Sequence, residues 1–195
     1  IGGDSGPFTF GPKAARRLAL EVSAQALRGG GSLLITTSAR TDPAAVLALR
    51  DTLTAPNFFY PWRANDEVNP YLGILGLADN IVVTGDSIAM LSEACATSKP
   101  VQIFDIGGMR NDRMTSRDFR VTGVLYDLLL RWGWQPLSRD ITLVHQKLVE
   151  SGWASWLGEA LPEPAQRDAA ADMNRAVAAV KKLFGQIGVA GTVEQ

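Results

Sequence analysis

The feature that most constrains this chain is a regular alternation of short apolar runs with longer amphipathic patterns. The runs lie at 32–37, 57–60, 80–84 and 101–104, and three of them contain mostly continuous apolar stretches (33–35, 81–83 and 101–104). Continuous apolar runs of this length are typical of strands that are covered on both faces, as in a parallel sheet. Helical patterns separate the runs, so the order predicts an α/β fold with right-handed crossovers.

Local signals mark where the helices begin and end. The pattern over 12–28 stops at the glycines 29–31, and the pairs Asp42-Pro43 and Asn69-Pro70 each place a capping residue before a proline at the first helical position. Apolar residues recur at helical spacing in 12–28 and again after Ser87. The expected core stripes are Ala15, Leu18, Ala19, Val22 and Ala26 in the first helix, and Ile88, Leu91, Ala94 and Cys95 in the later one.

The chain opens with Ile1 followed by a Gly-rich stretch. A turn of this composition usually follows a buried strand, so we expect Ile1 to end a first strand and the chain to begin within or just before that strand. A flexible amino-terminal arm is the alternative. With the first strand included, the sequence predicts a doubly wound, Rossmann-like parallel sheet of about five strands.

The second half of the chain predicts helices rather than strands. The strand signal ends at Asp105, 107–120 reads as an exposed charged loop, and helices are expected at 121–132, 141–152 and 165–184. The segment 185–195 lacks packing residues and should be frayed. We therefore divide the chain into a Rossmann-like domain over 1–160 and a helical carboxyl-terminal extension with a tail over 161–195. The stripe expected in the last helix is Met173, Val177, Val180 and Phe184.

Composition and charge exclude several classes of protein. With 46% apolar and 20% charged residues, the chain is not intrinsically disordered. Cys95 is the single cysteine, which excludes a disulfide framework within the chain. With His145 as the single histidine, a zinc site of nitrogen and sulfur ligands is excluded as well. We expect no metal and no cofactor. Nineteen basic residues against twenty acidic ones argue against a nucleic-acid partner. Cys95 should be inert core, and His145 a packed or surface residue.

Two Gly-containing turns are candidate anion sites. In an open parallel sheet, ligands bind at the carboxyl ends of the strands, where glycines and a following helix start let backbone N–H groups approach a phosphate. Neither turn matches the dinucleotide fingerprint or the P-loop, and an ordinary tight turn is the alternative for each. The first turn contains Gly3, Ser5 and Gly6, and the second contains Gly85, Asp86 and Ser87.

Further side chains could complete a ligand cleft at these strand ends. The guanidinium of Arg40 suits a diphosphate, and the alternative is an ion pair with an acid such as Asp42 or Asp66. Glu93 could accept hydrogen bonds from a pair of sugar hydroxyls, against the alternative of a solvated glutamate. Trp62 is the candidate for covering a base. The predicted cleft comprises Gly3, Ser5, Gly6, Arg40, Trp62, Asn69, Asp86, Ser87 and Glu93.

Several strings together resemble the mitochondrial-fission Elm family. They are Gly2-Gly3, Thr37-Ser38-Ala39-Arg40-Thr41, Asn69-Pro70-Tyr71, the run 78–87, Met90-Leu91-Ser92-Glu93-Ala94 and Lys99-Pro100-Val101. The resemblance covers about 1–105 and corresponds to the C-terminal half of that family's proteins. The biochemical activity of the family is poorly defined, so membership alone would not identify a reaction.

The same stretch is similar, more distantly, to the nucleotide-sugar-binding domain of GT-B glycosyltransferases. That resemblance implies that Glu93 holds the ribose, that the helix start at Ser87 faces the diphosphate, and that 3–6 reaches the phosphates. Asp86 and Ser98 stand where a small residue and a glycine are usual, which puts catalysis in doubt. The matching residues are Ala78, Asp79, Thr84, Ser87, Glu93, Lys99 and Pro100.

These resemblances lead to three hypotheses. The first is the nucleotide-sugar-binding half of a GT-B-like glycosyltransferase, which takes a UDP-type sugar and is inactive without an N-terminal domain to close the cleft. The second is a non-catalytic scaffold or interaction module, and the third is a sugar-nucleotide epimerase. We expect a cytoplasmic protein. Contact with the cytoplasmic face of a membrane is an option for the tryptophans at 132, 134, 153 and 156, with ordinary core use as the alternative.

Overall fold

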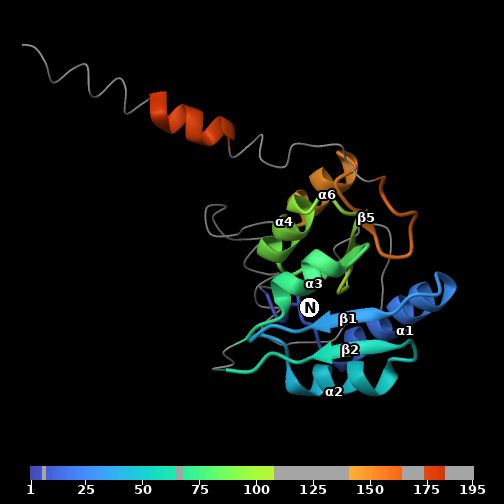
Figure 1. Ribbon diagram of the computed structural model, residues 1–195. Coiled ribbons are helices and arrows are strands. Elements are labelled where there is room, and N and C mark those ends of the chain that lie inside the picture. Colours follow the sequence, from blue (N-terminus) through green and yellow to red (C-terminus); the bar gives the residue numbers. More distant parts are fainter. Residues whose placement is uncertain (6–7, 65–67, 108–140, 164–173, 183–195) are drawn as a thin grey trace, which may run out of the picture.

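The strands that the structure describes pair in parallel and form two sheets (Figure 1). The computed structural model describes residues 1–5, 8–64, 68–107, 141–163 and 174–182. The first sheet pairs β1 (Leu33–Thr36) with β2 (Asn57–Tyr60). The second has the order β3 (Ile81–Thr84), β4 (Val101–Phe104) and β5 (Ser155–Trp156). Parallel strands alternating with helices confirm the predicted Rossmann-like α/β class.

The helices begin and end largely where local chemistry predicts. The side chain of Asp42 caps α2 by accepting from the N–H groups of Ala44 and Ala45, and Ser87 caps α4. At α3 the Asn69 side chain accepts the Tyr71 N–H at 3.0 Å, so this helix begins one residue later than a proline at the first position would place it. Within the described residues up to 163, the helices are α1 (Pro12–Arg28), α2 (Pro43–Thr52), α3 (Tyr71–Leu77), α4 (Ile88–Ala96) and α6 (Ile141–Glu150).

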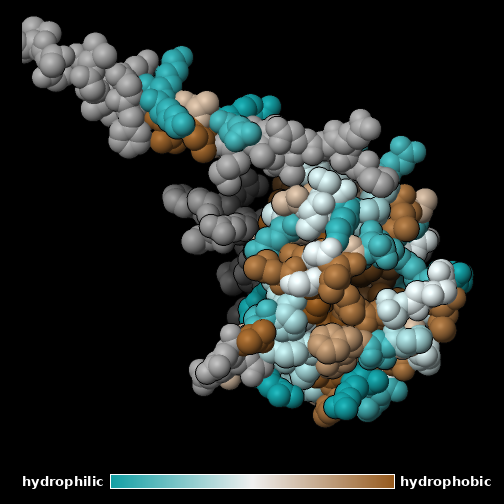
Figure 2. Space-filling model, viewed as in Figure 1, coloured by the Kyte–Doolittle hydropathy of each residue, from teal (hydrophilic) through white to brown (hydrophobic). Residues whose placement is uncertain are grey.

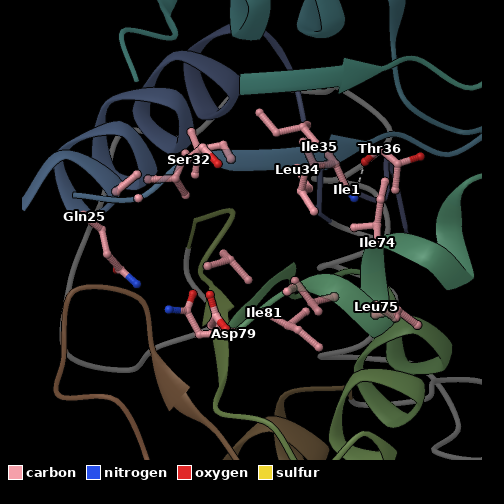
Figure 3. A pocket seen from close by; sticks show the side chains of 18 of the residues that line it. Ile1, Gln25, Ser32, Leu34, Ile35, Thr36, Ile74, Leu75, Asp79 and Ile81 are labelled. Atoms are coloured by element: carbon pink, nitrogen blue, oxygen red, sulfur yellow. Dashed lines mark hydrogen bonds between the residues drawn. The ribbon is translucent and has the colours of Figure 1, made fainter. Parts of the chain in front are cut away.

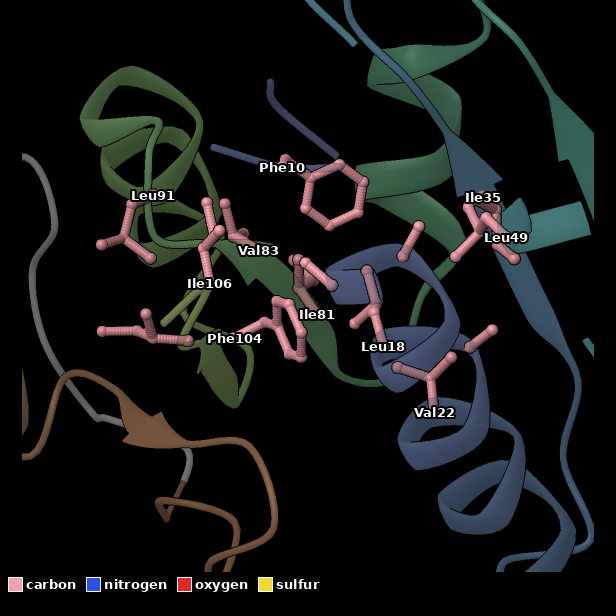
Figure 4. Packing of buried hydrophobic residues seen from close by; sticks show 14 of the residues in the cluster. Phe10, Leu18, Val22, Ile35, Leu49, Ile81, Val83, Leu91, Phe104 and Ile106 are labelled. Atoms are coloured by element: carbon pink, nitrogen blue, oxygen red, sulfur yellow. The ribbon is translucent and has the colours of Figure 1, made fainter. Parts of the chain in front are cut away.

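Helix α1 connects the two sheets through the hydrophobic core. Its residues Leu18 and Val22 lie between Ile35 of β1 on one side and Phe104 of β4 on the other (Figure 4). The Phe104 ring also meets Phe10 edge to face, with ring centroids 6.4 Å apart. The predicted stripe of α1 is largely confirmed, because Ala15, Leu18, Ala19 and Val22 are all buried.

Strand β5 corrects the prediction that the strand signal ends at Asp105. Ser155 and Trp156 pair with Gln102 and Ile103 of β4, at the edge of the second sheet. Two residues make no apolar run of their own. Their extended geometry therefore comes from pairing with β4, which the sequence does not display.

The remaining expectations for the second half have mixed outcomes. Helix α6 occurs where a helix was expected. The loop predicted over 107–120 lies outside the described residues from 108 onward, as do the helix predicted over 121–132 and the tail at 185–195. A helix is described at 174–182, inside the range predicted for the last helix. Val177 and Val180 of this helix are exposed, so they do not form the apolar packing stripe that the sequence predicts. The division at residue 160 stays a prediction.

Candidate functional site

The Gly-rich turn is fastened to the strand ends by its backbone. The Gly2 N–H donates to Thr84 Oγ1 at 2.7 Å, and the Gly3 N–H donates to Asp86 Oδ2 at 2.8 Å. A Cβ atom at Gly2 would lie 2.0 Å from Asp86 Oδ2, and one at Gly3 would lie 2.1 Å from the carbonyl oxygen of Arg40. Close approach to these neighbours therefore explains why glycine stands at both positions.

Arg40 and Asp86 form an ion pair at the centre of this region. Arg40 Nη2 lies 3.1 Å from Asp86 Oδ2, and Arg40 Nη1 donates to the Asp4 carbonyl at 2.9 Å. The Asp86 side chain is fully buried, whereas that of Arg40 is 47% exposed. The alternative of an ion pair for Arg40 is thus realised with Asp86 rather than with Asp42, whose carboxylate caps α2, while Asp66 lies outside the described residues.

Two carboxylates of these turns, Asp4 and Asp86, would repel a phosphate, and both accept hydrogen bonds within the protein. Asp4 Oδ1 accepts the Phe10 N–H at 3.0 Å, and Asp86 Oδ2 accepts from Gly3 and Arg40. Asp86 Oδ1 is buried and finds no hydrogen-bond partner within the described part of the chain. One acceptor of the buried carboxylate is therefore left over.

Ser5 is also engaged within its own turn. Its N–H donates to the Phe8 carbonyl at 3.0 Å, and the Phe8 N–H returns a bond of 3.1 Å to the Ser5 carbonyl. Together with Gly2 and Gly3, this makes three N–H groups of the turn that donate to protein acceptors. Gly6 lies outside the described residues.

Glu93 and Asn69 meet at a residue that the sequence reasoning did not assign to the site, Tyr71. The Tyr71 hydroxyl donates to Glu93 Oε2, and its N–H donates to Asn69 Oδ1. Burial raises the pKa of Tyr71 most, and the hydrogen bond to Glu93 and the charge of Glu93 raise it further. Tyr71 belongs to the string Asn69-Pro70-Tyr71, and this string was the sequence signal that could have assigned Tyr71 to the site.

Trp62 lies beside the end of β1. The backbone N–H of Trp62 donates to Thr37 Oγ1 at 2.9 Å. This hydrogen bond joins the segment after β2 to the segment after β1. Trp62 as a whole residue is 43% exposed. An exposed indole at a strand end is available to contact a ligand ring. That Trp62 covers a base stays a prediction.

Residues outside the cleft are used for packing. Cys95 is buried, and burial raises the pKa of its thiol, which fits the predicted inert role. His145 is fully buried and meets Trp156 edge to face at 5.9 Å, so Trp156 serves the core. The tryptophans at 132 and 134 lie outside the described residues.

The described residues provide neither a metal site nor a membrane-spanning helix. Within the described ranges, no cluster of His, Cys, Asp and Glu is arranged to hold a metal ion. In the same residues, no helix combines the length and the apolar character that crossing a membrane requires.

Comparison with known proteins relates these strings to one family. The family model described as mitochondrial fission ELM1 matches residues 1–124. A protein named mitochondrial fission protein ELM1 from Arabidopsis thaliana is 31% identical over 137 residues, which are 64% of this chain and 31% of the relative. An uncharacterised protein from Rickettsia prowazekii is 30% identical over 105 residues, which are 53% of this chain and 30% of the relative. No solved structure matches the chain.

Proposed function

The chain belongs to the mitochondrial fission ELM1 family, and from that premise we propose that it binds the nucleoside diphosphate part of a nucleotide sugar at its strand ends. The chain spans about a third of the length of the curated relatives it matches. The proposal therefore concerns binding by this part, and sugar transfer would require a second wall of the cleft.

One observation carries this proposal: three turns that are far apart in the sequence converge on the Asp86 carboxylate. Gly3, in the turn after Ile1, and Arg40, in the turn after β1, both donate to Asp86, which follows β3. In open α/β sheets, ligands bind where the strand order reverses and the connecting turns separate. β1 and β3 belong to different sheets, and Arg40 and Asp86 each follow the carboxyl end of one of these two strands, which supports a ligand site there.

The contacts modify the roles that the resemblance implies. Because the N–H groups of Gly2, Gly3 and Ser5 donate within the protein, the phosphates would rely on the half-exposed guanidinium of Arg40 and on the first turn of α4. The ribose would share Glu93 with the Tyr71 hydroxyl. The exposed Trp62 would cover the base.

Calorimetry with uridine diphosphate and with inorganic pyrophosphate tests these roles separately. Arg40→Lys should weaken both ligands, because a lysine keeps the charge beside buried Asp86 but loses the fork that binds phosphate oxygens. Glu93→Gln should weaken uridine diphosphate alone, since pyrophosphate has no ribose. Arg50→Ala, at an exposed position in the last turn of α2, is the matched control and should change neither. If neither uridine diphosphate nor pyrophosphate gave a heat of binding at millimolar concentration, nucleotide binding would be refuted.

The second candidate, a non-catalytic interaction module, has one observation in its favour. The turn donors are internally satisfied and the Arg40 guanidinium is already paired, while α3 exposes Leu72 and Leu77 (76% and 77%). A relative named for mitochondrial fission is compatible with such a role. Under this reading, Leu72→Ser would abolish capture of a partner protein, whereas Glu93→Gln would not affect it.

A further inference from the structure

A hydrophobic cavity separates the two sheets. It has a volume of about 600 Å³ and lies between β1 and β3, with α1 and α3 contributing to its walls. Leu34, Ile74 and Ile81 line its middle, whereas Gln25 and Asp79 stand at the end opposite Ile1 (Figure 3). Figure 2 shows hydrophobic residues around a hollow on the face where Figure 1 labels β1 and α3.

Among the strands that the structure describes, β1 pairs with β2 alone, so its backbone presents an open edge to this cavity. The Leu33 N–H donates to the Pro56 carbonyl at 2.9 Å, toward β2. Since successive residues of a strand point their backbone groups to opposite edges, Ile35 also faces β2, and Leu34 and Thr36 face the cavity. The Thr36 carbonyl confirms the direction, because it accepts the Ile1 ammonium across the cavity end at 2.8 Å.

The backbone of β3 presents a second open edge to the same cavity. The Ile81 N–H donates to the Pro100 carbonyl at 2.9 Å and the Gly85 N–H to the Phe104 carbonyl at 3.0 Å, both toward β4. By the same alternation, Val82 and Thr84 direct their N–H and C=O groups to the cavity. Backbone groups in the interior of a folded protein are almost always paired. Two facing rows of them therefore call for a partner that is itself a backbone.

Ile1 lies at the end of the cavity where β1 and β3 have their carboxyl ends, and it shows the direction in which such a backbone would run. Ile1 bonds to the end of β1, and Gly2 bonds to the end of β3, so both strands end at the same level. From there the chain leaves the cavity toward Asp86. Desolvation lowers the pKa of the Ile1 ammonium to about 6, although the Asp86 charge opposes this. A peptide bond at that nitrogen would place no charge there.

We propose that the cavity is the seat of one more parallel β-strand, an extended apolar peptide segment joined to the Ile1 nitrogen. The strand unites the two sheets in the order β2–β1–strand–β3–β4–β5. This is the order of the doubly wound dinucleotide-binding fold, with the added strand at its centre. A strand in that place is covered on both faces, so apolar residues suit all its positions. The inference stands independently of nucleotide binding.

The contacts of Ile1 also set the register of the strand. Because the Ile1 N–H reaches the Thr36 carbonyl, the residue two positions before it would donate to the Leu34 carbonyl and accept from the Thr36 N–H. The residue just before Ile1 would face β3, donating to Val82 and accepting from Thr84. A small apolar ligand could fill the volume but could not satisfy these backbone groups.

The test extends the full chain at Ile1 and measures amide hydrogen exchange. One variant carries Val-Ile-Val-Val before Ile1, and the control carries Ser-Gly-Ser-Gly. The apolar strand should slow exchange at Thr36 and Thr84 by about fivefold or more, as a new hydrogen bond of ordinary strength implies. Ile35 and Val83 face their partner strands and should change less, so they serve as internal references.

Two further measurements make the outcome decisive. Proline placed two positions before Ile1 removes the N–H that would reach Leu34 and should cancel most of the protection. The same apolar tetrapeptide added as a separate molecule should protect much less. Equal protection from the apolar and Ser-Gly extensions would overturn the proposal, as would unchanged uptake of a small apolar dye by the apolar-extended chain.

Discussion

Replacing Gly3 by alanine should destabilise the protein by about 3 kcal/mol. The new Cβ would lie 2.1 Å from the Arg40 carbonyl oxygen, whereas ordinary contacts begin at 3.4 Å, so one of the two backbone segments must move by more than 1 Å. Overpacking alone costs about 1–3 kcal/mol. The movement also strains the 2.8 Å bond from Gly3 to Asp86, and bonds to charged groups contribute about 1.5–3 kcal/mol.

The assay compares this variant with a glycine that has room for a methyl group. Gly73 lies inside α3 with nothing within 4 Å of its added Cβ, so Gly73→Ala should stabilise the protein by about 0.5–1 kcal/mol. In thermal unfolding, Gly3→Ala should lower Tm by roughly 6–12 °C and Gly73→Ala should raise it by about 2 °C. If Gly3→Ala unfolded within 1 °C of the unsubstituted chain, the packing argument for the turn would be refuted.

Three other perturbations have defined outcomes. In a chain that carries a free ammonium at Ile1, desolvation lowers the pKa of this group from 8.0 to about 6, so the unfolded chain binds more protons between these values. Its stability should then rise with pH from 6 to 8, by at most about 3 kcal/mol, and acetylating or extending that nitrogen should remove this part of the urea-denaturation profile. Asp42→Ala should cost about 1 kcal/mol by chemical denaturation, because two N–H groups of α2 lose their cap, whereas Asp42→Asn should cost a few tenths. Burial raises the thiol pKa of Cys95, so a disulfide reagent should label it far more slowly in the native protein than in urea, and equal rates would contradict its burial.

The site was only partly predictable from the sequence. The sequence indicated that Gly3, Arg40 and Asp86 belong to one edge, because each follows a strand-like run. It did not indicate that Arg40 pairs with Asp86, which lies 46 residues away, and it offered nearer acids instead. It also gave Glu93 a role without its partner Tyr71, 22 residues earlier. Such pairs depend on which strands become neighbours, and that information is not local.

The sequence by itself determined the fold class and most element boundaries. The bounds of α1, β2 and β4 match the predicted ranges, since prolines, glycines and apolar runs act on the backbone within a few residues. The tertiary structure alone decided that Ser155 and Trp156 form a strand, that the strands divide into two sheets, and that a cavity lies between β1 and β3. These features follow from backbone hydrogen bonds between distant segments, and such bonds are nearly blind to side-chain identity.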